Sequence, residues 1–236
     1  TQPKTIASLN IEALPERLSV GPTLPADMAA FEDAAMHIRS SARIVIKAGG
    51  GARKSAAAIR ALAERIGAAV VLSPGSNGVL PDNHPLNMHV GGSKGSISGN
   101  YAMEHAELLI VAGSRAVCQS DCSGTGYPNV KHVININGDI ADASHYNHTT
   151  ALIGDINLVV QRLLDVLGNV ERSDTVSRAS SPWLASCKAK KSEWQALRQE
   201  RTSVGALRDE AWNREILTQP TALAIAQAFA RKVNAL

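Results

Sequence analysis

Aromatic residues are scarce in this chain of 236 residues, where Phe, Trp and Tyr together make up 3% of the sequence. Hydrophobic residues of all kinds still account for 44%, which is enough to bury a sizeable core. That core must be built mainly from Ala, Val, Ile and Leu, because few aromatic side chains are available. Such a mixture is expected where helices pack closely on buried parallel strands.

Cysteine is also rare, and its three residues are an odd number. We therefore expect no disulfide framework, and a reducing compartment suits this composition better. Cys118 and Cys122 lie near His105 and His132 in the sequence, but a fourth ligand at a regular spacing is missing. Because structural zinc sites need four ligands, buried or loop thiols are the favoured interpretation, and the sequence predicts no metal site.

An excess of charge of one sign is missing as well. The formal net charge is +3, and lysines and arginines are mixed with acids along the chain. A nucleic-acid partner would call for a basic face or a binding motif, and we find neither. No apolar run approaches the length of a membrane span, and no signal-peptide pattern is recognisable. We expect a cytoplasmic protein without nucleic-acid or membrane partners.

The sequence does contain a regular alternation of strand and helix patterns. Short apolar runs predict strands at 43–48, 68–73, 107–113, 131–137 and 150–155, and periodic segments predict helices from Pro25 onward and at 54–67, 100–106 and 156–168. Gly67 and Gly168 stand at the ends of two of these helices, where glycine is favoured. Nearly continuous apolar strands separated by helices predict an α/β fold: a three-layer, doubly wound domain with a parallel sheet covered on both faces.

The ends of the chain differ in character from this alternation. We predict four segments: an N-terminal linker arm at 1–23, the α/β domain at 24–168, a linker with a charged helix at 169–218 and the truncated start of a further domain at 219–236. The charged helix, 182–201, is expected to be anchored by Trp183, Trp194 and Leu197. The last segment begins a helix whose apolar face has no following partner in the chain.

Glycine-rich turns follow several predicted strands, beginning with Gly49-Gly50-Gly51. In open α/β sheets, ligands bind beyond the carboxyl ends of the strands, so small residues there predict a crevice for an extended ligand. The turn is not a complete dinucleotide fingerprint, because Lys54 occupies the place of the third glycine of G-x-G-x-x-G. Glycine also ends strands because tight turns need positive φ, and this alternative stays open for each turn.

Several motifs in order carry a family resemblance over about residues 24–168. They are "RIVIKAGGGARKSAAAIRALAERIG", "GVLPDNHPLNMHVGG", "KGSISGNYAMEHAELLIVAGSR", "ININGDI" and "IGDI". Together they resemble the central domain of thiamine-diphosphate-dependent enzymes of the acetolactate synthase group, with the cyclohexanedione hydrolases as plausible closer relatives. The resemblance implies a six-stranded parallel sheet of the DHS-like NAD/FAD-binding type, lying between a pyrimidine-binding and a diphosphate-binding domain.

The same resemblance implies a cleft that holds FAD or ADP in some members and nothing in others. Carried over by position, the cofactor-binding residues are Gly49, Gly50, Gly51, Gly92, Gly113, Ser114, Arg115, Asn137, Gly138, Asp139, Ile140, Gly154 and Asp155. Two departures from the family pattern bear on whether FAD binds. Asn135 and Asn137 stand where the family normally has acids at the end of the fourth strand, and residues 116–119 replace the family's Phe-Asp-Asp type run.

Thiamine diphosphate and Mg²⁺ would bind in the full-length enzyme and not in this chain, which lacks a recognisable Gly-Asp-Gly motif. We therefore expect no catalytic residues here, and an inactive chain when it is purified alone. The implied partners are the flanking catalytic domains and further copies of the enzyme, as a dimer or tetramer. The alternatives are a free-standing FAD- or NAD-binding module of the same fold and a purely architectural domain with an eroded cleft.

Histidines are the remaining acid–base candidates. None has a paired carboxylate at a readable spacing, so solvated or capping roles are the favoured interpretation. The residues concerned are His84, His89, His105, His132, His145 and His148.

Overall fold

The structure is a computed structural model that describes residues 27–115, 125–143, 146, 148–168 and 181–233. Several predicted features lie outside these residues: the linker arm at 1–23, the run at 116–119, Cys118, Cys122, His145 and residues 169–180 of the predicted linker. Within the described ranges, no helix combines the length and the apolar character needed to cross a membrane.

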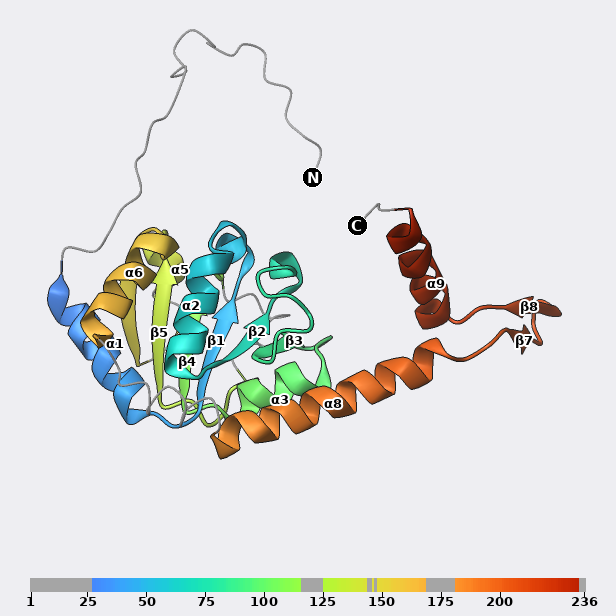
Figure 1. Ribbon diagram of the computed structural model, residues 1–236, viewed down its shortest axis with the longest axis horizontal. Helices are drawn as coiled ribbons and strands as arrows, with labels where there is room; N and C mark the ends of the chain where they lie inside the picture. The colour runs from blue at the N-terminus through green and yellow to red at the C-terminus, as the bar shows by residue number, and fades with distance from the viewer. Residues whose placement is uncertain (1–26, 116–124, 144–145, 147, 169–180, 234–236) are drawn as a thin grey trace, which may run out of the picture.

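Six parallel strands form one sheet in the order β3-β2-β1-β4-β5-β6 (Figure 1). They are β1 (Ile44–Ala48), β2 (Ala69–Leu72), β3 (Asn87–Val90), β4 (Leu108–Ala112), β5 (His132–Asn137) and β6 (Thr149–Ile153). Every residue of β1, β2 and β4 is buried, as expected for strands covered on both faces. The predicted doubly wound parallel sheet is confirmed.

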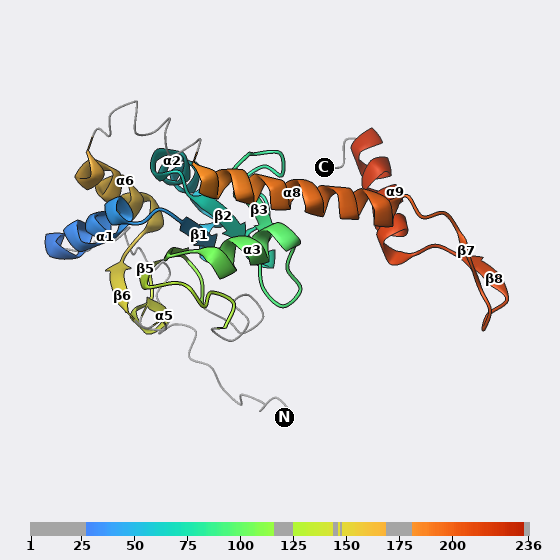
Figure 2. The same cartoon turned by 90° about the horizontal axis from the view of Figure 1, so that it is seen from below.

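Helices cover both faces of this sheet (Figure 2). They are α1 (Met28–Ser40), α2 (Ala56–Ile66), α3 (Ile97–His105), α5 (Ile140–Ala143) and α6 (Ile156–Leu167). Helices α1 and α2 both pack against α6 on one face, while α3 and α5 lie on the other. Gly67 ends α2 in the left-handed conformation, with φ 64°, and Gly168 ends α6 with φ 67°, so both predicted helix ends are confirmed.

Two strand features escaped the sequence prediction, and so did the short helix α5. Strand β3 is a four-residue edge strand within the stretch rich in glycine and proline, and its register with β2 shifts between Val70 and Leu72. A small antiparallel hairpin, β7 (Leu207–Asp209) and β8 (Arg214–Ile216), lies in the polar segment before the last helix, α9 (Gln219–Lys232). Neither has the run of apolar residues that marks a buried strand.

A long helix, α8 (Pro182–Thr202), packs along α3 and continues beyond the sheet (Figures 1 and 2). Trp183 is buried on it as predicted, whereas Trp194 and Leu197 are only half-buried. Cys187 and Lys191 occupy the buried positions instead. The Lys191 ammonium donates to two backbone carbonyls of the loop before β3, those of residues 82 and 84, each at 2.8 Å. Burial lowers the pKa of this lysine, and the two hydrogen bonds compensate part of its desolvation.

Cys187 is expected to be inert toward thiol reagents in the folded chain. Its side chain is fully buried, and burial raises the pKa of the thiol from 9.0 to about 12. Because the thiolate is the nucleophile, three pKa units lower the reactive fraction about a thousandfold at pH 8. Ellman's reagent on a Cys118→Ser/Cys122→Ser chain should label Cys187 only after urea is added. Fast labelling of the native chain would contradict the docked position of α8.

Candidate functional site

The order of the strands reverses between β1 and β4, which is the point where open α/β sheets bind ligands. The turns after these two strands lie against each other there. The N–H of Gly49 donates to the carbonyl of Ala112 at 2.8 Å, and the N–H of Gly51 donates to that of Gly113 at 3.0 Å. The sequence prediction that these turns share one edge of the sheet is therefore correct.

The tight contact between the two turns explains their glycines without a ligand. A Cβ atom on Gly49 would lie 2.3 Å from the carbonyl oxygen of Gly113 and 2.5 Å from the Cα of Ser114. A Cβ on Gly113 would lie 2.8 Å from the Cα of Gly51. The backbone φ of Gly113 is 60°, a value that residues other than glycine rarely adopt. Gly49, Gly51 and Gly113 thus let one turn approach the other.

Gly50 and Gly138 differ from this group because the space in front of them is open. A Cβ on Gly50 would meet its nearest neighbour, the carbonyl oxygen of Gly75, at 3.9 Å, and nothing lies within 4 Å of one on Gly138. Both residues are exposed, as are Arg115 and Asp139. An extended ligand could therefore approach the backbone at Gly50 and Gly138 without displacing protein atoms.

Asn137 links the ends of three strands. Its side-chain amide is nearly buried, donates to the carbonyl of Ser114 at 3.0 Å and accepts from the N–H of Asp139 at 3.3 Å. Its backbone carbonyl accepts from Gly154 at 2.9 Å. A carboxylate could accept but not donate at this position, which gives a physical reason for an asparagine here.

The acidic residues of the predicted site are engaged with the backbone. Asp155 is the N-cap of α6 and accepts from the N–H groups of residues 157 and 158 at 2.9 and 3.3 Å. Asp139 accepts from the N–H of Ala141 at 2.8 Å. Ile140 is 70% exposed beside it. Either carboxylate could contact a sugar hydroxyl only through its remaining lone pairs.

Gly92 stands apart from the other predicted site residues. It follows β3, two strands away from β1, with φ 117°. Its N–H and carbonyl are both held by the side chain of Asn100 on α3, at 2.8 and 3.0 Å. The structure gives it a local role in fixing the turn into α3.

The comparison with known proteins assigns the family. Residues 31–163 match the family described as "Thiamine pyrophosphate enzyme, central domain". The chain belongs to this family. It is 30% identical over 146 residues to the acetolactate synthase isozyme 1 large subunit of Escherichia coli, covering 61% of the chain and 26% of that protein. It is 28% identical over 158 residues to the chloroplastic acetolactate synthase of Arabidopsis thaliana. This match covers 66% of the chain and 23% of that protein. The chain spans about a quarter of the length of these relatives.

His84, His89 and His132 have carboxylate neighbours in the structure, although the sequence shows no such pairing at a readable spacing. The Nε2 atom of His84 lies 3.1 Å from Glu64, and the Nδ1 atom of His89 lies 3.9 Å from Asp82. His132 faces Asp33 at 4.0 Å. His84 precedes β3 and His132 begins β5, which places both at the edge of the sheet opposite the glycine turns. His105 contacts the carbonyl of Tyr101.

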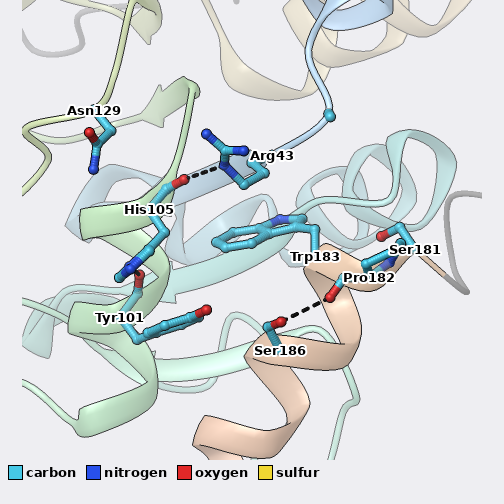
Figure 3. Close-up of a pocket in the computed structure, with 9 residues that line it drawn as sticks. Arg43, Tyr101, His105, Asn129, Ser181, Pro182, Trp183 and Ser186 are labelled. Carbon is cyan, nitrogen blue, oxygen red and sulfur yellow. Dashed lines mark hydrogen bonds between the residues drawn. The ribbon is translucent and has the colours of Figure 1, made fainter.

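A hollow of about 500 Å³ lies at that opposite edge of the central domain, where α8 meets α3 and the start of β1 (Figure 3). Its walls include the rings of Trp183, Tyr101 and His105. The guanidinium of Arg43 donates to the carbonyl of His105 at 2.8 Å and pairs with Glu107 at 2.9 Å. Because this cation is already paired, the hollow offers aromatic surface rather than an anion site.

Proposed function

We propose that this central domain is part of a thiamine-diphosphate- and Mg²⁺-dependent enzyme that makes or breaks C–C bonds next to a carbonyl. The observation that carries the proposal is the family match over residues 31–163, supported by the similarity to acetolactate synthases. When bound, thiamine diphosphate supplies a nucleophilic carbon and an electron sink. The central domain itself contributes no reacting group, and its partners are flanking catalytic domains and further copies of the enzyme.

The role that we propose for the chain's own residues is binding of an extended nucleotide, FAD or ADP, across the glycine turns. The diphosphate would lie at Gly50 and Arg115, where open backbone and an exposed guanidinium suit an anion. The adenosine would lie toward Gly138 and Asp139. This direction follows the sheet from β1 across β4 to β5.

A purely architectural domain is the second candidate function. It is favoured by the contact between Gly49, Gly51 and Gly113, since that contact accounts for three glycines without any ligand. In this case the glycines serve only to let the turns after β1 and β4 pack against each other.

Calorimetric titration of the purified chain with ADP and with FAD distinguishes the two. We expect binding of at least one of them, and we expect Arg115→Ala to weaken it about tenfold through loss of a charge-assisted contact to phosphate. Arg60→Ala, an exposed arginine on α2, is the matched control and should leave binding unchanged. If neither nucleotide binds at millimolar concentration, the nucleotide-binding role is wrong and the purely architectural role is supported. Turnover of pyruvate by the purified chain would contradict the non-catalytic assignment.

A further inference from the structure

The hollow between α3, α8 and the start of β1, called the aromatic hollow below, gathers aromatic side chains in a chain that has few. The sequence contains three tryptophans, three tyrosines and two phenylalanines, and Tyr101 and Trp183 both line this space, together with the ring of His105 (Figure 3). Its volume of about 500 Å³ is typical of small-molecule sites. The glycine turns follow the other end of β1, so the aromatic hollow is separate from the proposed nucleotide site.

The three rings present flat surface to whatever enters the aromatic hollow. Tyr101 and His105 stack one turn apart on α3, with centroids 4.2 Å apart and an interplanar angle of 26°. The ring of Trp183 on α8 lies 6.2 Å from that of Tyr101, at 22°. Tyr101 and His105 are half-buried, whereas Trp183 is 6% exposed. The first two rings can therefore accept a stacked planar ligand, and Trp183 forms a buried wall beside it.

His105 also offers a hydrogen-bond acceptor. Its Nδ1 atom lies 3.0 Å from the carbonyl oxygen of Tyr101. Because a carbonyl oxygen can only accept, Nδ1 carries the hydrogen, and Nε2 of the neutral ring is left with a lone pair. Within the part of the chain that the structure describes, no hydrogen-bond partner is found for this Nε2.

Arg43 and Asn129 fasten the end of α3 and keep further polar groups for a ligand. The Nε atom of Arg43 donates to the carbonyl of His105 at 2.8 Å, and one terminal nitrogen pairs with Glu107 at 2.9 Å. Asn129 donates to the carbonyl of Glu104 at 2.7 Å. Among the described residues, the second terminal nitrogen of Arg43 and Oδ1 of Asn129 have no partner. The aromatic hollow thus combines a donor with two acceptors.

We propose that the aromatic hollow binds a neutral, planar heteroaromatic molecule that carries an N–H beside a carbonyl, as in a cyclic amide. The ring stacks on Tyr101 and His105. The N–H of the ligand donates to Nε2 of His105, and its carbonyl accepts from the free N–H groups of Arg43. A neutral ligand fits because Glu107 already balances the charge of this arginine, so an anion would meet a carboxylate beside the guanidinium.

The test is a titration of the ¹⁵N-labelled chain with 2-quinolinone, a neutral two-ring cyclic amide, followed by NMR of the tryptophan indole N–H groups. The signals are assigned with Trp194→Phe and Trp212→Phe. We expect a saturable shift of the Trp183 signal with a Kd on the order of 0.5 mM, as for a ligand of this size. The Trp194 and Trp212 signals should stay in place, which locates the ligand in the aromatic hollow.

The hydrogen bond is tested with a matched probe. N-methyl-2-quinolinone has the same rings and carbonyl but no N–H, and we expect it to bind the parent chain at least about fivefold more weakly. His105→Phe keeps an aromatic ring and removes the acceptor, so the two probes should bind this variant equally. Tyr101→Leu should weaken both probes about fivefold through loss of stacking. Trp212→Phe, in the exposed hairpin, is the control and should bind as the parent chain does.

The comparison of the two probes on the parent chain keeps the proposal testable if a variant fails to fold. Equal affinity of the parent chain for both probes would overturn the cyclic-amide assignment. The binding site itself would be overturned by the absence of a saturable Trp183 shift at millimolar 2-quinolinone, or by equal shifts of all three indole signals. So would unchanged affinities in folded Tyr101→Leu and His105→Phe chains.

Discussion

Gly49→Ala is expected to lower the free energy of unfolding by about 3 kcal/mol or more, the upper range for overpacking a rigid contact. The new methyl carbon would lie 2.3 Å from the carbonyl oxygen of Gly113 and 2.5 Å from the Cα of Ser114. Both neighbours are backbone atoms, so no side chain can rotate away, and the turns after β1 and β4 must separate. Urea denaturation followed by circular dichroism measures the loss.

The matched control is Gly138→Ala, which adds the same methyl group at the end of β5. Nothing lies within 4 Å of the added carbon, so the change in unfolding free energy should stay within about 0.5 kcal/mol. The backbone of Gly49 has φ −92°, a value open to alanine, so a large effect there reports the contact and not the conformation. Similar losses in both variants would contradict the tight approach of the two turns.

The fold could be predicted from the sequence where burial is complete. Strands β1 and β4 are buried at every position, so both appear in the sequence as apolar runs that need no knowledge of their partners. Strand β3 pairs on one side only and spans four residues, with Asn87 and His89 among them. An edge strand of this kind leaves no periodic signal.

The candidate site could be located from the sequence but not explained by it. The glycine turns were placed at one edge because parallel strands point the same way. Whether Gly49 faces a ligand or another turn depends on Gly113, which is distant in the sequence and adjacent in space. The contact between Asp33 and His132 was missed for the same reason. Lys191 was missed because a lysine in a charged helix is normally solvated.

Trp183→Ala should be the second strongly destabilising change, with a loss of about 3–5 kcal/mol, the usual range for truncating a buried large aromatic residue. The indole is 6% exposed and its N–H donates to the carbonyl of Ile44 at the start of β1, at 3.3 Å. Truncation opens a cavity between α8 and the sheet and removes the donor from that carbonyl. Only a few other residues of α8 are buried, among them Cys187 and Lys191. We therefore expect α8 to detach from the domain before the sheet unfolds.

Hydrogen exchange separates these two steps, and Trp212→Ala provides the control. Trp212 is 67% exposed and contacts Arg214 through its ring face, so its loss should cost less than about 1 kcal/mol. In Trp183→Ala, amide protection should fall first in α8 and in α3, which packs along it, while β1 and β4 stay protected. A uniform loss of protection across the sheet would mean that α8 is an integral part of the core. Equal effects of the two tryptophan substitutions would contradict the docking of α8 through Trp183.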